Sequence, residues 1–244
     1  MIPVIIVDDE PLARILVVEY LSKYPEFEIV AECGDGFEAV KKITELKPSL
    51  LFLDIQMPKI NGFEMLELLD ELPKVIFTTA FDEFAIKAFD NNAIDYLLKP
   101  FSEDRFAKAL NKWRLTQNTK DDLKEVIENY TIATSQNNRI VVKEKGKIKI
   151  IPVEEVYYIE ASSDFVKIHS QQGLLLKSKT MNYFENSLNP NLFVRTHRSY
   201  ILNIEQIIKL ELYEKDSYVA VLKNNAKVPV SKTGYQKLKI VMGF

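Results

Sequence analysis

The stretch Val4-Ile5-Ile6-Val7-Asp8-Asp9 is an apolar run that ends abruptly in two acidic residues. Three later apolar runs also end in polar residues: Leu50-Leu51-Phe52-Leu53-Asp54, Val75-Ile76-Phe77-Thr78-Thr79 and Tyr96-Leu97-Leu98-Lys99-Pro100. Runs this short and this apolar are typical of strands that are buried on both faces of a parallel sheet. Because open α/β sheets bind ligands at the carboxyl ends of their strands, we expect these polar residues to meet at one edge.

Segments with helical spacing of apolar residues lie between these runs. They cover Pro11 to about Tyr24, Phe37–Leu46, Gly62–Leu69 and about Asp82–Asn91. A fifth helix is expected after Ser102, whose hydroxyl can cap its first turn, and a further strand is expected near Glu28–Cys33. Five strands that alternate with helices predict an α/β fold with a doubly wound, five-stranded parallel sheet.

The second half of the chain consists of short runs rich in β-branched and aromatic residues, which predict a mostly antiparallel all-β domain with short helices. The expected strands are Arg139–Val142, Lys147–Ile151, Val156–Ile159, Phe165–His169, Leu174–Lys177, Phe193–Arg195, Ile207–Leu212, Tyr218–Leu222 and Ala226–Val230. The first two strands flank Lys145-Gly146 as a hairpin. Helices are expected over about Thr180–Ser187 and Lys232–Val241.

The polar segment Thr134-Ser135-Gln136-Asn137-Asn138 separates the two patterns and is typical of a linker. We therefore predict a first domain over residues 1–118, a linker over 119–138 and a second domain over 139–244. Residues 1–120 contain 14 Lys and Arg against 21 Asp and Glu, whereas residues 139–244 contain 17 against 10. This asymmetry indicates either that the basic half meets a polyanion or only that two domains differ in charge.

The composition excludes several classes of protein. The chain has 244 residues and a single cysteine, Cys33, which excludes a disulfide framework and favours a reducing compartment. Its first residues lack the basic and apolar regions of a secretory signal, and no apolar run has the length of a membrane span. We therefore expect a cytoplasmic protein. Two separated histidines and one cysteine offer no transition-metal site.

Asp8, Asp9 and Asp54 have the ligand chemistry of a Mg²⁺ site, because this hard cation takes oxygen ligands and often bridges carboxylate to phosphate. An aspartate can also act as the nucleophile toward phosphorus. Lys99 is a point charge suited to a phosphate oxygen. Phosphatases with an aspartyl nucleophile place a second aspartate two residues later as general acid. Gln56 stands at that position and has no carboxylate, so we do not expect an enzyme.

The first half resembles the receiver domain of two-component response regulators, which has a flavodoxin-like fold. The resemblance covers residues 1–118 and rests on five elements in order along the chain. These elements are Asp8-Asp9, Asp54 with Met57-Pro58, Asn61-Gly62, Thr79-Ala80 and Lys99-Pro100.

This resemblance implies that Asp54 accepts a phosphoryl group from a histidine kinase and that Lys99 contacts that group. It implies Mg²⁺ as the cofactor. The ion would be held by Asp8, Asp9, Asp54 and the backbone carbonyl of Gln56. Thr79 and Tyr96 would form a switch pair that responds to phosphorylation, and the Lys99-Pro100 peptide bond would be cis.

The segment Phe193-Val194-Arg195-Thr196-His197-Arg198-Ser199-Tyr200-Ile201-Leu202-Asn203 mixes basic, hydroxyl and aromatic residues. Arg195 and Arg198 suit phosphate or the edge of a guanine, and His197 and Ser199 can donate to phosphates. The segment resembles the LytTR-type DNA-binding domain of LytR/AlgR-like response regulators. Two further segments resemble this domain, namely Tyr157–Ala161 and Asp164–Ile168. The resemblance covers about residues 138–243.

The second resemblance implies an elongated antiparallel β fold whose edge loops enter successive major grooves of DNA. The implied DNA contacts are Ser162, Ser163, Asp164, Lys167, His197, Arg198, Ser199 and Lys232, and Tyr235 is a further candidate. Ser162-Ser163 stands where many relatives have a glycine-containing turn. Four aromatic side chains are instead expected in the core, namely Tyr157, Phe165, Phe193 and Tyr200.

We interpret the chain as a DNA-binding response regulator that controls transcription. Its expected partners are a sensor histidine kinase, promoter DNA with repeated half-sites and a second copy of itself. Phosphorylation of Asp54 would promote dimerisation, and thereby promoter binding, through a face that includes Lys87, Asp90, Asp95, Arg105 and Lys112. Two alternatives stay open: a β domain that binds protein or RNA, and a phosphorylation-independent transcription factor that keeps the receiver only as a dimer module.

Overall fold

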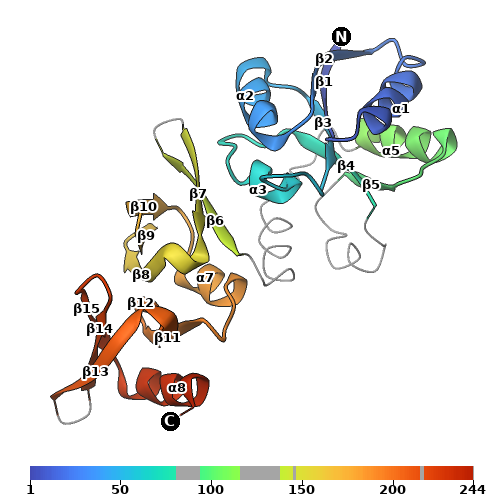
Figure 1. Ribbon diagram of the computed structural model, residues 1–244. Helices are drawn as coiled ribbons and strands as arrows, with labels where there is room; N and C mark the ends of the chain where they lie inside the picture. Colours follow the sequence, from blue (N-terminus) through green and yellow to red (C-terminus); the bar gives the residue numbers. More distant parts are fainter. Residues whose placement is uncertain (81–93, 116–137, 145–146, 215–216, 244) are drawn as a thin grey trace. The chain divides into compact units, whose positions relative to one another are not determined.

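The computed structural model describes residues 1–80, 94–115, 138–144, 147–214 and 217–243 (Figure 1). The chain divides into two compact units, residues 1–130 and 131–244. The predicted linker falls almost wholly outside the described residues, as does the helix expected over about Asp82–Asn91. None of the described helices is long and apolar enough to cross a membrane.

The first unit is built on a five-stranded sheet in the order β2-β1-β3-β4-β5, in which every neighbouring pair is parallel. Its strands are β1 (Ile2–Val7), β2 (Phe27–Cys33), β3 (Leu50–Asp54), β4 (Lys74–Thr79) and β5 (Asp95–Leu98). All five residues of β3 are buried, as a central strand covered on both faces requires. The predicted parallel α/β fold is confirmed.

Helices cover both faces of this sheet, with α1 (Pro11–Leu21) and α5 (Glu103–Leu115) on one face and α2 (Gly36–Leu46) and α3 (Gly62–Leu66) on the other (Figure 1). Helix α1 ends at Leu21, earlier than the predicted Tyr24, and Pro25 disfavours helical backbone at Tyr24 itself. Helix α3 also ends early, at Leu66 instead of Leu69. Ser102 accepts a bond from the Arg105 N–H and so caps α5 as expected.

The core between the sheet, α1 and α5 is rich in aromatic rings. The Phe52 and Phe106 rings stack with their centroids 5.2 Å apart, and Trp113 packs against Phe27 at the same separation. Because Phe52 lies on β3 and Phe106 on α5, this stack fixes the helix against the strand that ends in Asp54.

The second unit contains three antiparallel sheets with the strand orders β10-β9-β8-β12-β11, β13-β14-β15 and β6-β7. The strands are β6 (Arg139–Glu144), β7 (Lys147–Pro152), β8 (Val156–Ser162), β9 (Phe165–Ser170), β10 (Gly173–Lys177), β11 (Phe193–His197), β12 (Tyr200–Asn203), β13 (Ile207–Glu214), β14 (Ser217–Leu222) and β15 (Lys227–Val230). The helices are α7 (Met181–Ser187) and α8 (Lys232–Met242). The predicted antiparallel β domain with short helices is confirmed, although strand β12 was not expected.

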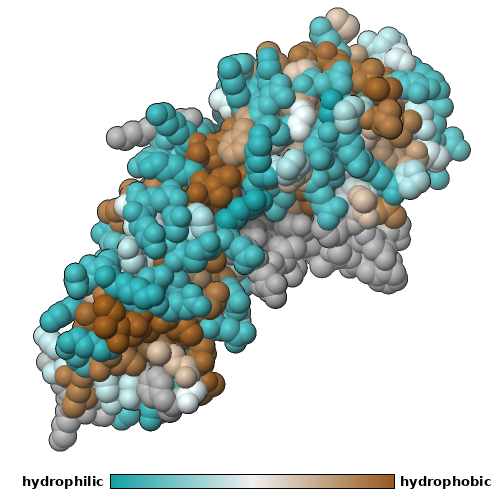
Figure 2. All heavy atoms as spheres, in the orientation of Figure 1, coloured by the Kyte–Doolittle hydropathy of each residue, from teal (hydrophilic) through white to brown (hydrophobic). Residues whose placement is uncertain are grey.

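Two apolar cores hold this unit together. One lies under β8, β9, β10 and α7, and the other joins β11, β12 and the three-stranded sheet to α8. Figure 2 shows apolar atoms at the surface over the three-stranded sheet, where Ile208, Leu212 and Tyr213 are more than half exposed.

One of the four aromatic core predictions is wrong. Phe193 is buried, and Tyr157 and Tyr200 are half-buried against the second core. Phe165 is 47% exposed. It alternates with the buried Val166 along β9 and therefore lies on the outer face of the sheet, next to the β8–β9 turn.

Candidate functional site

Three carboxylates meet at the carboxyl edge of the parallel sheet. Asp8 follows β1 and Asp54 ends β3, and these two neighbouring strands bring their side chains together. One oxygen from each of Asp8, Asp9 and Asp54 lies within 4.8 Å of the others. Asp8 and Asp54 are buried and Asp9 is exposed. The donor set of hard oxygens therefore fits a divalent cation such as Mg²⁺ with one side open to solvent.

Lys99 joins this cluster from the end of β5. Its Nζ lies 2.7 Å from Oδ2 of Asp8, 3.2 Å from Oδ2 of Asp54 and 3.5 Å from Oε2 of Glu10. The Lys99 backbone N–H donates to the carbonyl oxygen of Thr79 (2.7 Å), which ties the ends of β4 and β5 together. The Lys99-Pro100 peptide bond is cis, as expected.

The loop after β3 is held close to Asp54. The Gln56 backbone N–H donates to Oδ1 of Asp54 (3.2 Å), and the Gly62 N–H donates to the carbonyl oxygen of Ile55 (2.9 Å). A Cβ on Gly62 would lie 2.5 Å from the carbonyl oxygen of Asp54, so only glycine allows this approach. The structure thus places the Gln56 backbone next to the carboxylates.

Burial dominates the electrostatics of the two inner carboxylates. It raises the pKa of Asp54 to about 6, although the Lys99 ammonium opposes the shift, and the charge of Asp8 adds to it. Burial also raises the pKa of Asp8, against a hydrogen bond from Lys99. One lysine does not neutralise this cluster, and a divalent cation would supply the missing positive charge.

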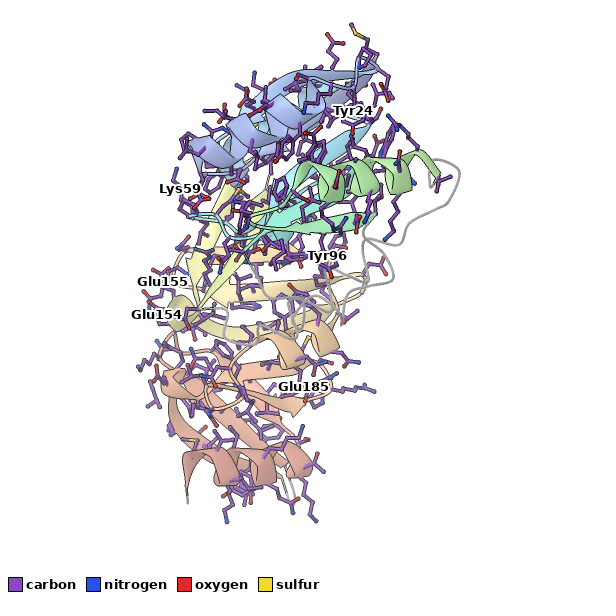
Figure 3. The ribbon with its side chains drawn as sticks, turned by 90° about the vertical axis from the view of Figure 1, so that its right-hand side faces the viewer. Tyr24, Lys59, Tyr96, Glu154, Glu155 and Glu185 are labelled. Atoms are coloured by element: carbon purple, nitrogen blue, oxygen red, sulfur yellow. The ribbon has the colours of Figure 1, made fainter. Side chains whose placement is uncertain are left out.

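The residues expected to form the switch lie on the two neighbouring strands. Thr79 ends β4 and is buried, and Tyr96 lies on β5 beside α5 (Figure 3). The Arg105 guanidinium lies 5.7 Å from the centre of the Tyr96 ring and donates to the Tyr96 carbonyl oxygen. Arg105 also binds both carboxylate oxygens of Asp95, at 2.7 and 2.8 Å.

The expected dimer face is described only in part. Asp95 pairs within the chain with Arg105 and also lies 3.9 Å from Nζ of Lys112. Lys87 and Asp90 lie outside the described residues.

In the second unit, the segment Phe193–Asn203 forms the antiparallel hairpin β11–β12, with Arg198 and Ser199 at its turn. Nδ1 of His197 accepts a bond from the Ser199 N–H (3.2 Å), so Nε2 of His197 is left as the donor. The Ser199 carbonyl oxygen accepts from the Ala161 N–H (2.9 Å). The exposed Arg198 side chain therefore projects from a turn whose backbone is held on both sides.

A second turn joins β8 to β9. It contains Ser163, whose φ of 48° is left-handed, and the exposed Asp164. A serine thus adopts the backbone conformation for which glycine is favoured. Ser162 and the partly buried Lys167 flank this turn on the two strands.

Lys232 begins α8 immediately after Ser231, which caps the helix by accepting from the Gly234 N–H. The Ser231 N–H and hydroxyl both donate to the carbonyl oxygen of Thr196 on β11. These two hydrogen bonds hold the start of α8 against β11, the strand that also contains His197. Tyr235 stacks on Tyr218 with a centroid separation of 3.7 Å, so its ring packs within the unit.

Arg195 lies on β11 and its side chain is mostly buried. Its guanidinium donates to Asn182, to Glu185 and to the carbonyl oxygen of Arg198, all within its own chain. The Arg195 guanidinium, whose chemistry also suits phosphate or a guanine edge, thus has partners within the second unit. The partners Asn182 and Glu185 were missed from the sequence, although their i, i+3 spacing on a helix is a signal that they share a face.

His169 lies on the outer face of the five-stranded sheet, as a packing or surface residue should. Its Nε2 lies 2.9 Å from Oε2 of Glu160, and its ring stacks on Tyr158 at 4.0 Å. These partners lie beside Tyr200 on β12.

Comparison with known families agrees with both units. Residues 4–111 match the response regulator receiver domain, and residues 146–243 match the LytTr DNA-binding domain. A response regulatory protein of Shewanella oneidensis, itself uncharacterized, is 37% identical over the full length of both chains.

Two named relatives align over nearly the whole chain. The sensory transduction protein LytT of Enterococcus faecalis is 34% identical over 98% of both chains. The transcriptional regulatory protein BtsR of Escherichia coli strain K12 is 36% identical over the full length of both.

The parallel sheet with its acidic edge and the antiparallel β unit define a two-domain regulator that couples a receiver to a DNA-binding module. The chain belongs to the response regulators that combine a receiver domain with a LytTR DNA-binding domain.

Proposed function

We propose that this response regulator is switched by phosphorylation of Asp54 by a histidine kinase. The observation that carries the proposal is the convergence of Asp8, Asp9 and Asp54 with the Lys99 ammonium at one sheet edge. Such a site has a nucleophilic oxygen, ligands for a cation and a fixed positive charge for the transferred group. At neutral pH an aspartate with a pKa of about 6 is mostly ionised and thus ready to attack phosphorus.

The residues of the site have different roles in phosphoryl transfer. Asp8, Asp9, Asp54 and the Gln56 carbonyl oxygen would hold Mg²⁺, which supplies charge neutralisation to the phosphoryl oxygens. Asp54 forms the new oxygen–phosphorus bond while the nitrogen–phosphorus bond of a phosphohistidine breaks. The Lys99 ammonium would then pair with the negative oxygens of the phosphoryl group, because its Nζ already lies 3.2 Å from Oδ2 of Asp54.

Phosphorylation replaces the single negative charge of the Asp54 carboxylate with an acyl phosphate of about −1.5 to −2, and the added charge lies beside the neighbouring strands. Thr79 is buried at the end of β4, and its carbonyl oxygen is bonded to the Lys99 N–H. We expect Thr79 and Tyr96 to rearrange together and to alter the face that includes Asp95, Arg105 and Lys112. Two chains joined there would place two DNA-binding units on adjacent half-sites.

The second unit would bind promoter DNA through two turns and the start of α8. His197, Arg198 and Ser199 form one contact group, Ser162, Ser163, Asp164 and Lys167 the second, and Lys232 the third. The positive balance of residues 139–244 supports a polyanionic partner. The outward Arg198 guanidinium has the fork geometry that reads guanine or binds phosphate.

The test uses the full-length protein with Mg²⁺ and a radiolabelled small phosphodonor. Asp54→Ala should abolish acyl-phosphate labelling and the phosphodonor-stimulated increase in DNA affinity, whereas Asp104→Asn, a change of an exposed aspartate on α5, should leave both intact. Labelling that persists in Asp54→Ala would rule out this phosphoacceptor. Capture of RNA in preference to genomic DNA fragments would instead support an RNA-binding output.

A further inference from the structure

Arg195 connects helix α7 to the β11–β12 turn. Its Nη1 donates to Oδ1 of Asn182 (2.6 Å) and to Oε2 of Glu185 (2.8 Å), and its Nη2 donates to the carbonyl oxygen of Arg198 (3.0 Å). The Arg195 side chain is only 23% exposed. One planar group thus joins a helix to the backbone of the turn from which Arg198 projects.

Glu185 is the residue that orients this guanidinium. It lies on α7 (Figure 3), and its two carboxylate oxygens contact Arg195 of β11 and, at 3.3 Å, Nζ of Lys237 on α8. Burial alone would raise its pKa, but the hydrogen bonds from Arg195 and Lys237 lower the pKa of Glu185 below its usual value. Glu185 is therefore charged at neutral pH and links β11 to the helix that begins at Lys232.

Two other backbone groups of the turn are also hydrogen-bonded. The Ser199 N–H donates to His197 and the Ser199 carbonyl oxygen accepts from Ala161. The bond from Arg195 to the Arg198 carbonyl oxygen completes this set. By contrast, no hydrogen bond or ion pair of the Arg198 guanidinium is present among the described residues.

We propose that the Glu185–Arg195 pair positions the His197–Ser199 turn for sequence-specific DNA binding, with both residues acting through Arg198 and neither contacting DNA. The inference rests on the proposed DNA-binding function. A turn that is already ordered loses less conformational entropy on binding, so the pair should favour the specific complex over the non-specific one.

The first measurement compares Glu185→Gln with the matched control Glu205→Gln, an exposed glutamate of the same unit. Both variants remove one negative charge. The probes are a genomic duplex selected by the wild-type full-length protein and a scrambled duplex of equal length, titrated at fixed salt with Mg²⁺ and phosphodonor present. Glu185→Gln should weaken binding to the selected duplex about tenfold and leave the scrambled duplex unaffected. Glu205→Gln should change neither.

The variant Arg195→Lys distinguishes a role of Arg195 in positioning the turn from a direct contact between Arg195 and DNA. Lysine keeps the positive charge but cannot make the three bonds of the guanidinium. If Arg195 positions the turn, Arg195→Lys should lose specific affinity to the same degree as Glu185→Gln, with the salt dependence of binding unchanged. If Arg195 instead contacts phosphate, Lys should retain most of the affinity, and Glu185→Gln should strengthen binding by releasing the arginine. Either result would overturn the proposal.

A double-mutant cycle tests whether the pair acts through Arg198. In an Arg198→Ala background, Glu185→Gln should cost little further affinity, whereas independent structural damage would add to the loss. Thermal melts monitor folding, and if both Glu185→Gln and Arg195→Lys fail to fold, the pair serves the core and the proposal is wrong. Wild-type protein that binds no DNA in a salt-dependent manner contradicts the proposed function itself. Wild-type binding with unchanged Glu185→Gln affinity contradicts only this inference.

Discussion

Nζ of Lys99 lies 2.7 Å from Oδ2 of Asp8, and the two side chains are only 15% and 2% exposed. The same ammonium lies 3.2 Å from Asp54. Lys99 therefore partly neutralises two of the three carboxylates that would bind Mg²⁺. Lys99 and a bound cation would therefore compete for the same negative charge, and each would lower the affinity of the carboxylates for the other.

Lys99→Ala should consequently bind Mg²⁺ more tightly than the wild type, by about tenfold, because one nearby positive charge is removed. The same variant should be labelled poorly by a phosphodonor, because the phosphoryl group loses its fixed cation. Isothermal titration calorimetry measures the first effect. Lys59→Ala, which removes an exposed lysine paired with Asp35, should change neither property. Weaker Mg²⁺ binding by Lys99→Ala would show that the lysine supports the cation site instead of competing with it.

Asp54 gives a pH-dependent contribution to stability in protein kept free of metal with EDTA. Its pKa is raised from 3.8 to about 6, so the folded state holds this proton more tightly than the unfolded state. Ionised Asp54 therefore destabilises the fold, and the penalty grows as pH rises from about 4 to about 6 and is complete above that. At pH 7.5 Asp54→Asn should stabilise the receiver unit by about 1–3 kcal/mol.

Denaturant unfolding at pH 4 and at pH 7.5 checks this sign. The advantage of Asp54→Asn should be large at pH 7.5 and nearly absent at pH 4. Saturating Mg²⁺ should reduce it at pH 7.5, because the cation offsets the charge of the wild-type carboxylate. A variant that is less stable than the wild type at pH 7.5 in EDTA would contradict the argument.

Helix α8 packs on β11 at a position that tolerates only glycine. A Cβ on Gly234 would lie 1.9 Å from the carbonyl oxygen of Thr196, which is backbone and cannot rotate away. Gly234→Ala should therefore destabilise the DNA-binding unit by about 2–4 kcal/mol and displace the start of α8. Gln236→Ala, a change of an exposed residue on the same helix, should be nearly neutral. Far-ultraviolet circular dichroism during thermal melting compares the two variants.

The receiver half of the chain was predictable from sequence because a parallel sheet brings together residues that follow its strands, even when they are far apart in the sequence. Each apolar run had to be a buried strand, and parallel strands bring their carboxyl ends to one edge. Asp8, Asp54 and Lys99 were therefore expected to meet, and they do. The ends of α1 and α3 were less predictable, because they depend on local backbone preferences beyond the apolar pattern.

The β half was predictable in class but not in its side-chain contacts. Strand β12 was missed because the basic and hydroxyl residues before it suggested a loop. Phe165 was expected inside because it is aromatic, yet alternation along β9 places it outside. The partners of Arg195 come from α7, thirteen and ten residues earlier in the chain. How that helix packs on β11 is a tertiary outcome that no local pattern encodes.

The proposed DNA contacts are of two kinds, to base edges and to phosphates. The salt dependence of binding distinguishes the two kinds. Arg198 projects from the ordered turn and should contribute to sequence recognition, whereas Lys232 begins α8 as an exposed cation and should bind phosphate. Arg198→Ala should weaken binding to the selected duplex by about 1–3 kcal/mol and reduce the preference over a scrambled duplex. Lys232→Ala should weaken both duplexes similarly and lower the slope of log affinity against log salt by about 1.

Lys223→Ala provides the matched control, because Lys223 lies in the β14–β15 turn, at the opposite end of β15 from Lys232. It removes the same charge from the same unit and should leave the salt slope unchanged. Fluorescence anisotropy with the full-length protein at several salt concentrations gives affinities and slopes together. Equal slopes for all three variants would mean that Lys232 does not contact the backbone of the duplex. Loss of preference in Lys232→Ala but not in Arg198→Ala would reverse the assignment of the two residues, because discrimination between sequences requires a contact to base edges or to a deformed duplex.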